Sequence, residues 1–136
     1  KEKTKDNPVF YVQYAYARIN SLLRMSNTSL VKKIQFDEIN FTLNEMDEKI
    51  IRKVFEWPKI IESVSRKFDL HKIPFYLYEL STLFHAYWSR GNEDKRYKFI
   101  ENEQIKRKET LAIINLVAIV IKNGMSILDV SLPKKM

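Results

Sequence analysis

A chain of 136 residues with 45% hydrophobic and 30% charged residues has the composition of a globular domain, which excludes disordered and fibrous proteins. It contains no cysteine and only two histidines, so disulfides, thiolate metal sites and histidine-rich metal clusters are excluded as well. The net charge of +7 is compatible with a polyanionic partner, although lysines on the solvated faces of helices would give the same value.

The start of the chain does not look like a targeting segment. Residues 1–6 are charged and lack the pattern of a signal peptide, so we interpret them as the end of a linker and expect the chain to be a domain of a longer protein. Residues 7–136 then form one domain. The longest apolar run, Leu111–Ile121, is shorter than the roughly 20 residues that a membrane-spanning helix needs. We therefore expect a cytoplasmic domain that has no membrane partner.

Proline positions and hydrophobic spacing predict helices in chain order. Pro8, Pro58 and Pro74 each open a segment of helical periodicity, where a missing N–H group costs nothing. Thr42 to Glu45 reads as a capping box ahead of another helix, and the apolar run at 111–121 predicts a buried helix. Residues 27–41 are expected to be irregular, and an extended tail is expected from Asp129. The predicted fold is an all-α bundle of about five helices with an extended C-terminal tail.

The two glycines provide further punctuation. Gly91 and Gly124 each follow a segment of helical periodicity. Since a residue just past a helix end often adopts the left-handed conformation, both are expected to terminate helices.

Catalytic chemistry is not indicated. A chain with two glycines cannot form a glycine-rich phosphate loop, and no nucleophile, base and acid occur at catalytic spacing. The carboxylates Glu45, Asp47 and Glu48 are predicted to lie on a solvated helix face, and His85 is predicted to be a hydrogen-bonded structural or surface residue. We therefore predict no catalytic residue, no metal site and no cofactor in this chain.

The first predicted helix carries two stripes. At 100° per residue, Tyr14 and Arg18 fall about −60° and about −20° from Tyr11, so the three form one stripe. A separate apolar stripe is expected to face the core, and it contains Val12, Ala15, Ile19, Leu22 and Leu23. The aromatic stripe therefore needs another partner, which is either a second helix or single-stranded nucleic acid whose bases stack on the rings.

The order of residues 7–18, NPVFYVQYAYAR, closely resembles the entry to the C-terminal anticodon-binding domain of bacterial arginyl-tRNA synthetases. Phe10 replaces a tyrosine of the family pattern, and Tyr16 replaces a histidine. Two later segments, YLYELSTLFHAYWSR and NGMSILDVSLPKKM, also resemble family segments in the same order. In the second, Asp129 replaces a glycine, so we expect that turn to be built differently.

The resemblance implies an α-helical anticodon-binding domain of a ligase that attaches arginine to its tRNA. ATP and magnesium would be used by the absent catalytic domain, so this chain alone is expected to bind the anticodon loop without enzymatic activity. Carried over position by position, the resemblance implies anticodon contacts at Tyr11, Tyr14, Arg18 and Met136.

Further candidates for RNA contact come from aromatic and basic positions. Tyr87 and Trp88 match aromatic positions of the family, although their spacing fits a core equally well. Lys106, Arg107 and Lys108 are candidates for phosphate contacts, which position RNA without reading its sequence. The alternative function is a helical protein–protein interaction module, because tyrosine and arginine are also favoured at protein interfaces.

Overall fold

The computed structural model describes residues 7–25, 42–130 and 132. Within that part of the chain it contains the five α-helices α1 (Pro8–Met25), α2 (Glu45–Phe55), α3 (Trp57–Lys67), α4 (Lys72–Glu93) and α5 (Lys108–Ile127). The expected all-α bundle of about five helices is therefore confirmed. The predicted linker at 1–6 and the irregular segment at 27–41 lie outside the described residues, as does most of the predicted tail.

A short hairpin between α4 and α5 was not expected from the sequence. The 3₁₀ helix η2 (Lys95–Tyr97) leads into β1 (Ile100–Glu101), which pairs antiparallel with β2 (Gln104–Ile105). The two loop residues, Asn102 and Glu103, have φ angles of 51° and 60°. Positive φ at both positions is typical of a type I′ turn, whose usual sequence is Asn-Gly. With glutamate in the second position, the sequence carries only half of that signal.

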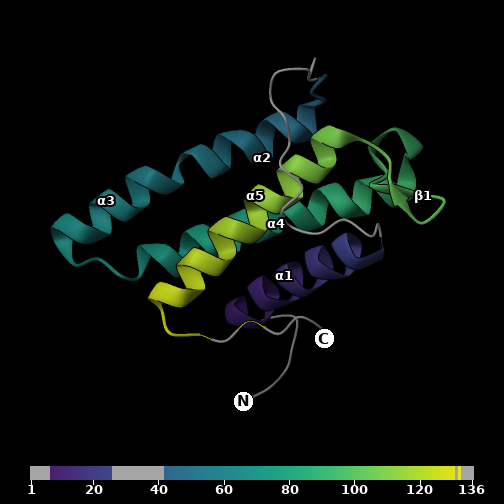
Figure 1. Cartoon of the computed structure of the whole chain (residues 1–136). Helices are drawn as coiled ribbons and strands as arrows, with labels where there is room; N and C mark the ends of the chain where they lie inside the picture. The colour runs from purple at the N-terminus through teal and green to yellow at the C-terminus, as the bar shows by residue number, and fades with distance from the viewer. Residues whose placement is uncertain (1–6, 26–41, 131, 133–136) are drawn as a thin grey trace.

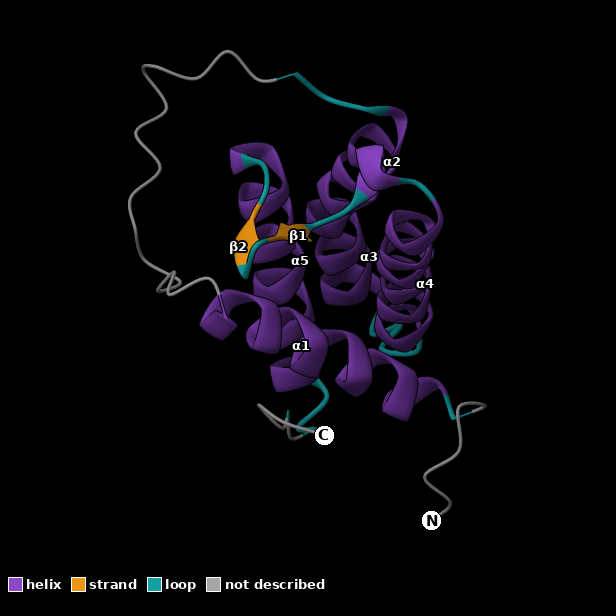
Figure 2. Ribbon diagram, turned by 90° about the vertical axis from the view of Figure 1, so that its right-hand side faces the viewer, coloured by secondary structure: helices purple, strands orange, loops and turns teal. Residues whose placement is uncertain are grey.

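The helices form three layers with α4 and α5 in the middle (Figure 1). On one side α1 packs against α4 and α5, and on the other side α2 packs against the same two helices. In Figure 2, α1 crosses below α4 and α5, the two helices against which it packs. The predicted apolar stripe of α1 is confirmed, because all five of its residues are buried, at Val12, Ala15, Ile19, Leu22 and Leu23. Burial of such side chains contributes about 1.5–3 kcal/mol each.

The prolines begin helices as predicted. Pro8 is the first residue of α1, Pro58 the second of α3 and Pro74 the third of α4. All three therefore lie in a first helical turn, where the backbone N–H that proline lacks has no partner within the helix.

The prediction for the two glycines was wrong. Gly91 and Gly124 both lie inside helices, α4 and α5, and neither has a positive φ. A Cβ at Gly91 would lie 2.8 Å from the backbone oxygen of Tyr97, and one at Gly124 would lie 2.7 Å from Cδ1 of Leu77. These glycines allow close approach between elements, a tertiary requirement that is not visible in local sequence.

The left-handed residue at the end of α5 is Asp129. Its φ is 55°, its N–H donates to the carbonyl of Ser126, and the N–H of Val130 donates to the carbonyl of Met125. This hydrogen-bond pattern is a Schellman motif, in which glycine is the usual left-handed residue. The expectation of a differently built turn at Asp129 is therefore wrong for the backbone, which adopts the conformation that favours glycine.

Helix α5 is longer than the apolar run that predicted it. It has 20 residues and is long and apolar enough to cross a membrane by length and composition alone. Half of that apolar window is buried inside the protein, against α1, α2 and α4. The apolar run at 111–121 therefore underestimated the length of the apolar helix. The burial of α5 is typical of a core helix.

The predicted capping box forms two residues later than expected. Asn44 is the N-cap of α2: its side-chain oxygen accepts from the backbone N–H of Asp47, and the Asp47 carboxylate accepts from the backbone N–H of Asn44. Thr42 instead contacts the start of α5, because its backbone N–H donates to Glu109 and its carbonyl accepts from Arg107.

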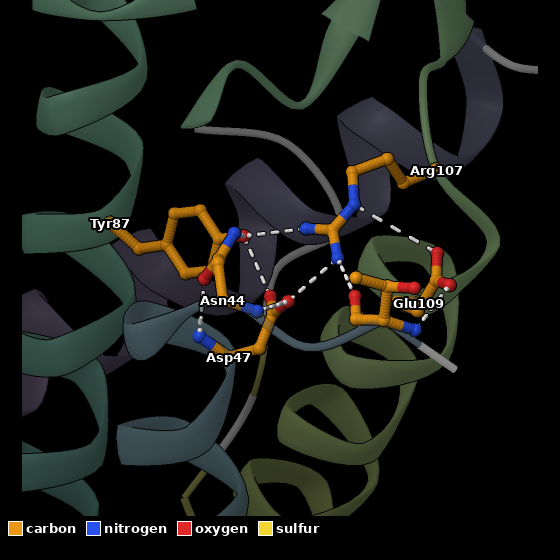
Figure 3. A network of polar contacts seen from close by, with 6 residues as sticks. Asn44, Asp47, Tyr87, Arg107 and Glu109 are labelled. Carbon is orange, nitrogen blue, oxygen red and sulfur yellow. Dashed lines mark hydrogen bonds and ion pairs between the residues drawn. The ribbon is translucent and has the colours of Figure 1, made fainter. Parts of the chain in front are cut away.

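Asp47 is the centre of a buried polar network (Figure 3). It is 0% exposed, so the prediction of a solvated carboxylate was wrong for this residue. Its carboxylate accepts from the Tyr87 hydroxyl at 2.7 Å and from the Arg107 guanidinium at 2.8 Å. The Tyr87 hydroxyl also accepts from the Asn44 amide at 2.9 Å. The network thus joins the starts of α2 and α5 to α4, with every charge paired.

Replacing Gly91 by alanine is expected to lower the free energy of unfolding by about 1–3 kcal/mol. Alanine favours helices, but the added Cβ would collide with the backbone of η2, which cannot move as a side-chain end can. Urea denaturation would measure the loss. The control is Asn92→Ala at the exposed neighbouring position, where stability should stay the same or rise; equal stability of the two variants would contradict the packing argument.

Replacing Asp47 by alanine should cost about 3–5 kcal/mol. The change leaves the Arg107 charge and the Tyr87 hydroxyl without their shared acceptor in a buried site. Thermal unfolding would detect this as a large drop in Tm. The matched control is Glu48→Ala on the exposed side of α2, for which a change within about 0.5 kcal/mol is expected.

Candidate nucleic-acid interface

The aromatic stripe predicted on α1 forms one continuous face beside the buried stripe. Tyr14 is exposed, while Tyr11 and Arg18 are half-buried. The helix therefore separates an apolar side from a Tyr/Arg side, as the spacing predicted. The role of these three residues in binding RNA stays a prediction.

Arg18 is held by two aromatic rings. Its guanidinium donates to the Tyr14 hydroxyl at 3.0 Å, and its Cζ lies 4.8 Å from the Tyr14 ring centroid and 5.1 Å from that of Trp88 on α4. Cation–π contacts of this kind stabilise a guanidinium by about 0.5–2 kcal/mol. A guanidinium carries five N–H donors, so the bond to Tyr14 does not exhaust its capacity to bind a phosphate or a base edge.

Trp88 is half-buried and packs edge-on against the core residue Phe99, with 5.7 Å between ring centroids. Its other contact is the guanidinium of Arg18. Among the further aromatic candidates, Trp88 is therefore the one that the structure brings to the α1 stripe.

His85 supports the stripe from beneath. Its Nε2 lies 3.4 Å from the carbonyl oxygen of Tyr11, and its ring centroid lies 4.4 Å from the Tyr11 ring and 5.8 Å from the Tyr14 ring. Because a carbonyl only accepts, Nε2 carries the proton in this contact. Burial lowers the pKa of His85, the bond to Tyr11 opposes this, and the Arg18 charge lowers the pKa further. The predicted structural, hydrogen-bonded histidine is confirmed.

Tyr16 lies on the opposite side of α1 from Tyr14. It is buried, and with Lys122, Ser126 and Val130 it lines a groove at the C-terminal end of α5. The position where this chain departs from the family's histidine is therefore part of the packing between α1 and α5.

Tyr87 was a candidate for RNA contact, and the structure corrects this. The residue is 1% exposed, so its ring cannot stack on a base. Its hydroxyl belongs to the Asp47 network, and burial together with the bond to Asp47 raises its pKa to about 12.

The three basic candidates are not equivalent. Arg107 is committed to Asp47, Thr42 and Glu109, so the expectation of a phosphate contact there is corrected. Lys106 donates to the carbonyl of Lys95 at 3.3 Å and lies 3.9 Å from Glu101. Lys108 is exposed at the start of α5. Met136, the fourth predicted anticodon contact, lies outside the described residues.

Sequence reasoning offered Trp88 of α4 as a candidate for this face but missed Tyr78 and His85 on the same helix. Tyr78 packs against Tyr11 with 5.2 Å between ring centroids, and the His85 ring contacts both Tyr11 and Tyr14. A signal was present, because residues seven apart on a helix share one face. Which helix packs against the α1 stripe could not be read from that spacing.

Lowering the pH from 7.5 to 5.5 should reduce stability through His85. Its pKa in the folded protein lies below the unfolded value of about 6.5, so below that pH the unfolded chain binds a proton that the folded chain does not. The free energy of unfolding, measured in urea at each pH, should therefore fall. His85→Gln should reduce the fall, whereas the control His71→Gln, at an exposed site, should keep it; an unchanged pH dependence in His85→Gln would contradict this assignment.

Residues 12–136 match the model of the DALR anticodon binding domain. The chain is 43% identical over 136 residues to an arginine–tRNA ligase of Pelagibacter ubique and 36% identical over 141 residues to one of Chelativorans sp.. Both alignments cover at least 99% of this chain and 24% of the relative, so the chain spans about a quarter of the length of these relatives.

A solved structure supports the same assignment. The crystal structure of a protein assigned as an arginyl-tRNA synthetase from Campylobacter jejuni matches with a TM-score of 0.77 and 26% sequence identity. The match covers 99% of this chain and 28% of that one. The family model covers far more than half of the chain, so this protein belongs to the DALR anticodon-binding domain family.

Proposed function

We propose that this chain binds the anticodon loop of arginine tRNA through the face made by Tyr11, Tyr14 and Arg18. The observation that carries the proposal is the pairing of an exposed tyrosine with an arginine fixed over it. Unpaired bases of RNA loops stack on such rings and are hydrogen-bonded along their edges. The membership in an anticodon-binding family favours RNA over a second protein helix as the partner.

The geometry gives each residue a separate role. Tyr14 offers an exposed ring on which an anticodon base can stack, and Tyr11 supports it through their common neighbour His85. Arg18 donates to a base edge or a phosphate from a position set by Tyr14 and Trp88. Met136, at the chain end, is proposed to close over the bound loop. Lys106 and Lys108 are proposed to contact the phosphate backbone.

The rest of the function is proposed from the relatives. Since they are arginine–tRNA ligases about four times as long as this chain, we propose that the domain works beside a catalytic domain of the same polypeptide. That domain would use ATP and magnesium to attach arginine to tRNA in the cytoplasm, without a membrane partner. In this scheme, the present chain supplies tRNA recognition and no catalytic residue. Among the described residues, no three histidine, aspartate or glutamate side chains are placed to hold a metal ion.

The test is binding of a stem-loop that carries the anticodon of arginine tRNA, measured by fluorescence anisotropy. Tyr14→Ala should weaken binding about 5- to 150-fold, because stacking of one base on an aromatic ring is worth about 1–3 kcal/mol. Arg18→Ala should weaken it and should also reduce discrimination against a stem-loop with a changed middle anticodon base.

Matched controls separate this face from the general basic charge. Phe55→Ala removes an exposed aromatic ring on α2, and Arg66→Ala removes an exposed guanidinium on α3. Both should leave the affinity within about twofold of the unmodified chain. Anticodon recognition by α1 is wrong if the middle base has no effect and Tyr14→Ala behaves like Phe55→Ala.

A further inference from the structure

The candidate interface does not end at α1, because its aromatic surface continues onto α4. Tyr78 is 42% exposed, and its ring lies 5.2 Å from the Tyr11 ring at an interplanar angle of 43°. One edge of Tyr78 is thus anchored to the stripe, while much of the side chain remains open to solvent. A tyrosine held in this way has already lost most of its rotamer freedom, which lowers the entropic cost of binding a ligand.

A hollow lies beside Tyr78 on the same helix. It has a volume of about 340 Å³ and is lined by Tyr78, Glu79, Thr82 and Leu83 of α4 and by Lys53 of α2. This volume is at the lower end of the range for small-ligand pockets, which suits one flat ring rather than a helix. Its wall next to Tyr78 is apolar at Leu83, so a ring stacked on the tyrosine would also be desolvated on one edge.

The charges in the hollow argue against a phosphate as its occupant. Lys53 forms ion pairs with both Glu79 and Glu56, and the Glu79 carboxylate is 61% exposed. A phosphate would meet an exposed carboxylate and a lysine that is already neutralised. An uncharged planar group meets no such penalty.

The polar rim selects among planar groups. The Thr82 hydroxyl donates its proton to the carbonyl of Tyr78 at 2.9 Å, so toward a ligand it can only accept. Glu79 likewise only accepts. A base with an exocyclic amino group, such as adenine or cytosine, can donate to these acceptors, as cytosine does to carboxylates in duplex recognition.

We propose that Tyr78 and the hollow beside it form a second nucleobase site, which holds an unpaired, amino-bearing base next to the base on Tyr14. The proposal rests on the proposed function, because continuity with the Tyr11–Tyr14 face is what identifies single-stranded RNA as the occupant. It adds α4 to the recognition surface and implies that two bases of one loop are held at the same time.

The experiment uses the 136-residue chain and the arginine anticodon stem-loop, with 2-aminopurine placed at each loop position in turn. In the unmodified chain, fluorescence quenching should occur at two positions. Tyr78→Ala should remove quenching at one of these positions and weaken binding about 5- to 150-fold. Tyr78→Phe keeps the ring and should retain both the quenching and the affinity. At the lost position, adenine or cytosine should bind more tightly than uracil.

The control is Phe75→Ala, which removes another exposed ring about one turn away on α4 and should change the affinity less than twofold. A double-mutant cycle with Tyr11→Ala tests whether Tyr78 contacts the RNA or only supports Tyr11. Additive losses of affinity in the two variants indicate a base on Tyr78. No further loss of affinity when Tyr78→Ala is added to Tyr11→Ala would mean that Tyr78 only holds Tyr11, and it would overturn the proposal. Loss of binding in Tyr14→Ala but not in Tyr78→Ala overturns the second site alone. Failure of the proposed function would give a different result: neither variant would change the affinity, and neither would a change of the middle anticodon base.

Discussion

Burial of the apolar stripe of α1 against α4 and α5 determines which other residues of α1 face outward. Val12, Ala15 and Ile19 are each at most 3% exposed, so the rotation of the helix about its axis is fixed by close packing. Tyr11, Tyr14 and Arg18 follow from that rotation. Once one stripe of a helix is buried, only its remaining surface can face outward. In this chain, the part of that surface beside the buried stripe carries the Tyr/Arg face.

Helix α4 supports both sides of this arrangement. Its residues Leu77, Leu80 and Phe84 are fully buried and pack in the core. On a neighbouring face, Tyr78 and His85 lie seven residues apart and contact the rings of α1. The same packing that stabilises the fold therefore sets the spacing of the aromatic rings. Recognition groups on two packed helices are held more precisely than groups on loops, which is what stacking and hydrogen bonding to one base require.

Much of this could be predicted from the sequence where local patterns decide the outcome. The buried stripe of α1, the proline starts and the separate Tyr/Arg stripe follow from helical periodicity and backbone chemistry. The glycines, Asp47 and Tyr87 could not be assigned in this way, because their roles depend on neighbours far away in the chain. The missing side chain at Gly91 allows the backbone of η2 to approach α4 closely, and the charge of Asp47 is neutralised by an arginine 60 residues later. The local sequence pattern predicts a surface position for Asp47, and its burial is stable only because the tertiary partner compensates its charge.

The assignment of Arg107 to the core changes the electrostatics of the interface. Arg107 closes the buried network by pairing with Asp47, while burial lowers the pKa of His85 beneath the tyrosines. Within the described residues, Arg18 is the cation that contacts aromatic rings at the α1 stripe directly. A face on which Tyr14 and Trp88 hold one guanidinium, with Tyr11 and Tyr78 packed beside it, is suited to stacking and directed hydrogen bonds more than to general charge attraction. Stacking releases no counterions, and each neutralised phosphate of a single strand contributes only about −0.7 to the slope of log affinity against log salt concentration. We therefore expect the contribution of this face to the proposed RNA affinity to depend weakly on salt. Under the proposed function, the +7 charge of the chain would act mainly by attracting RNA at a distance, and the base preference would come from the α1 face.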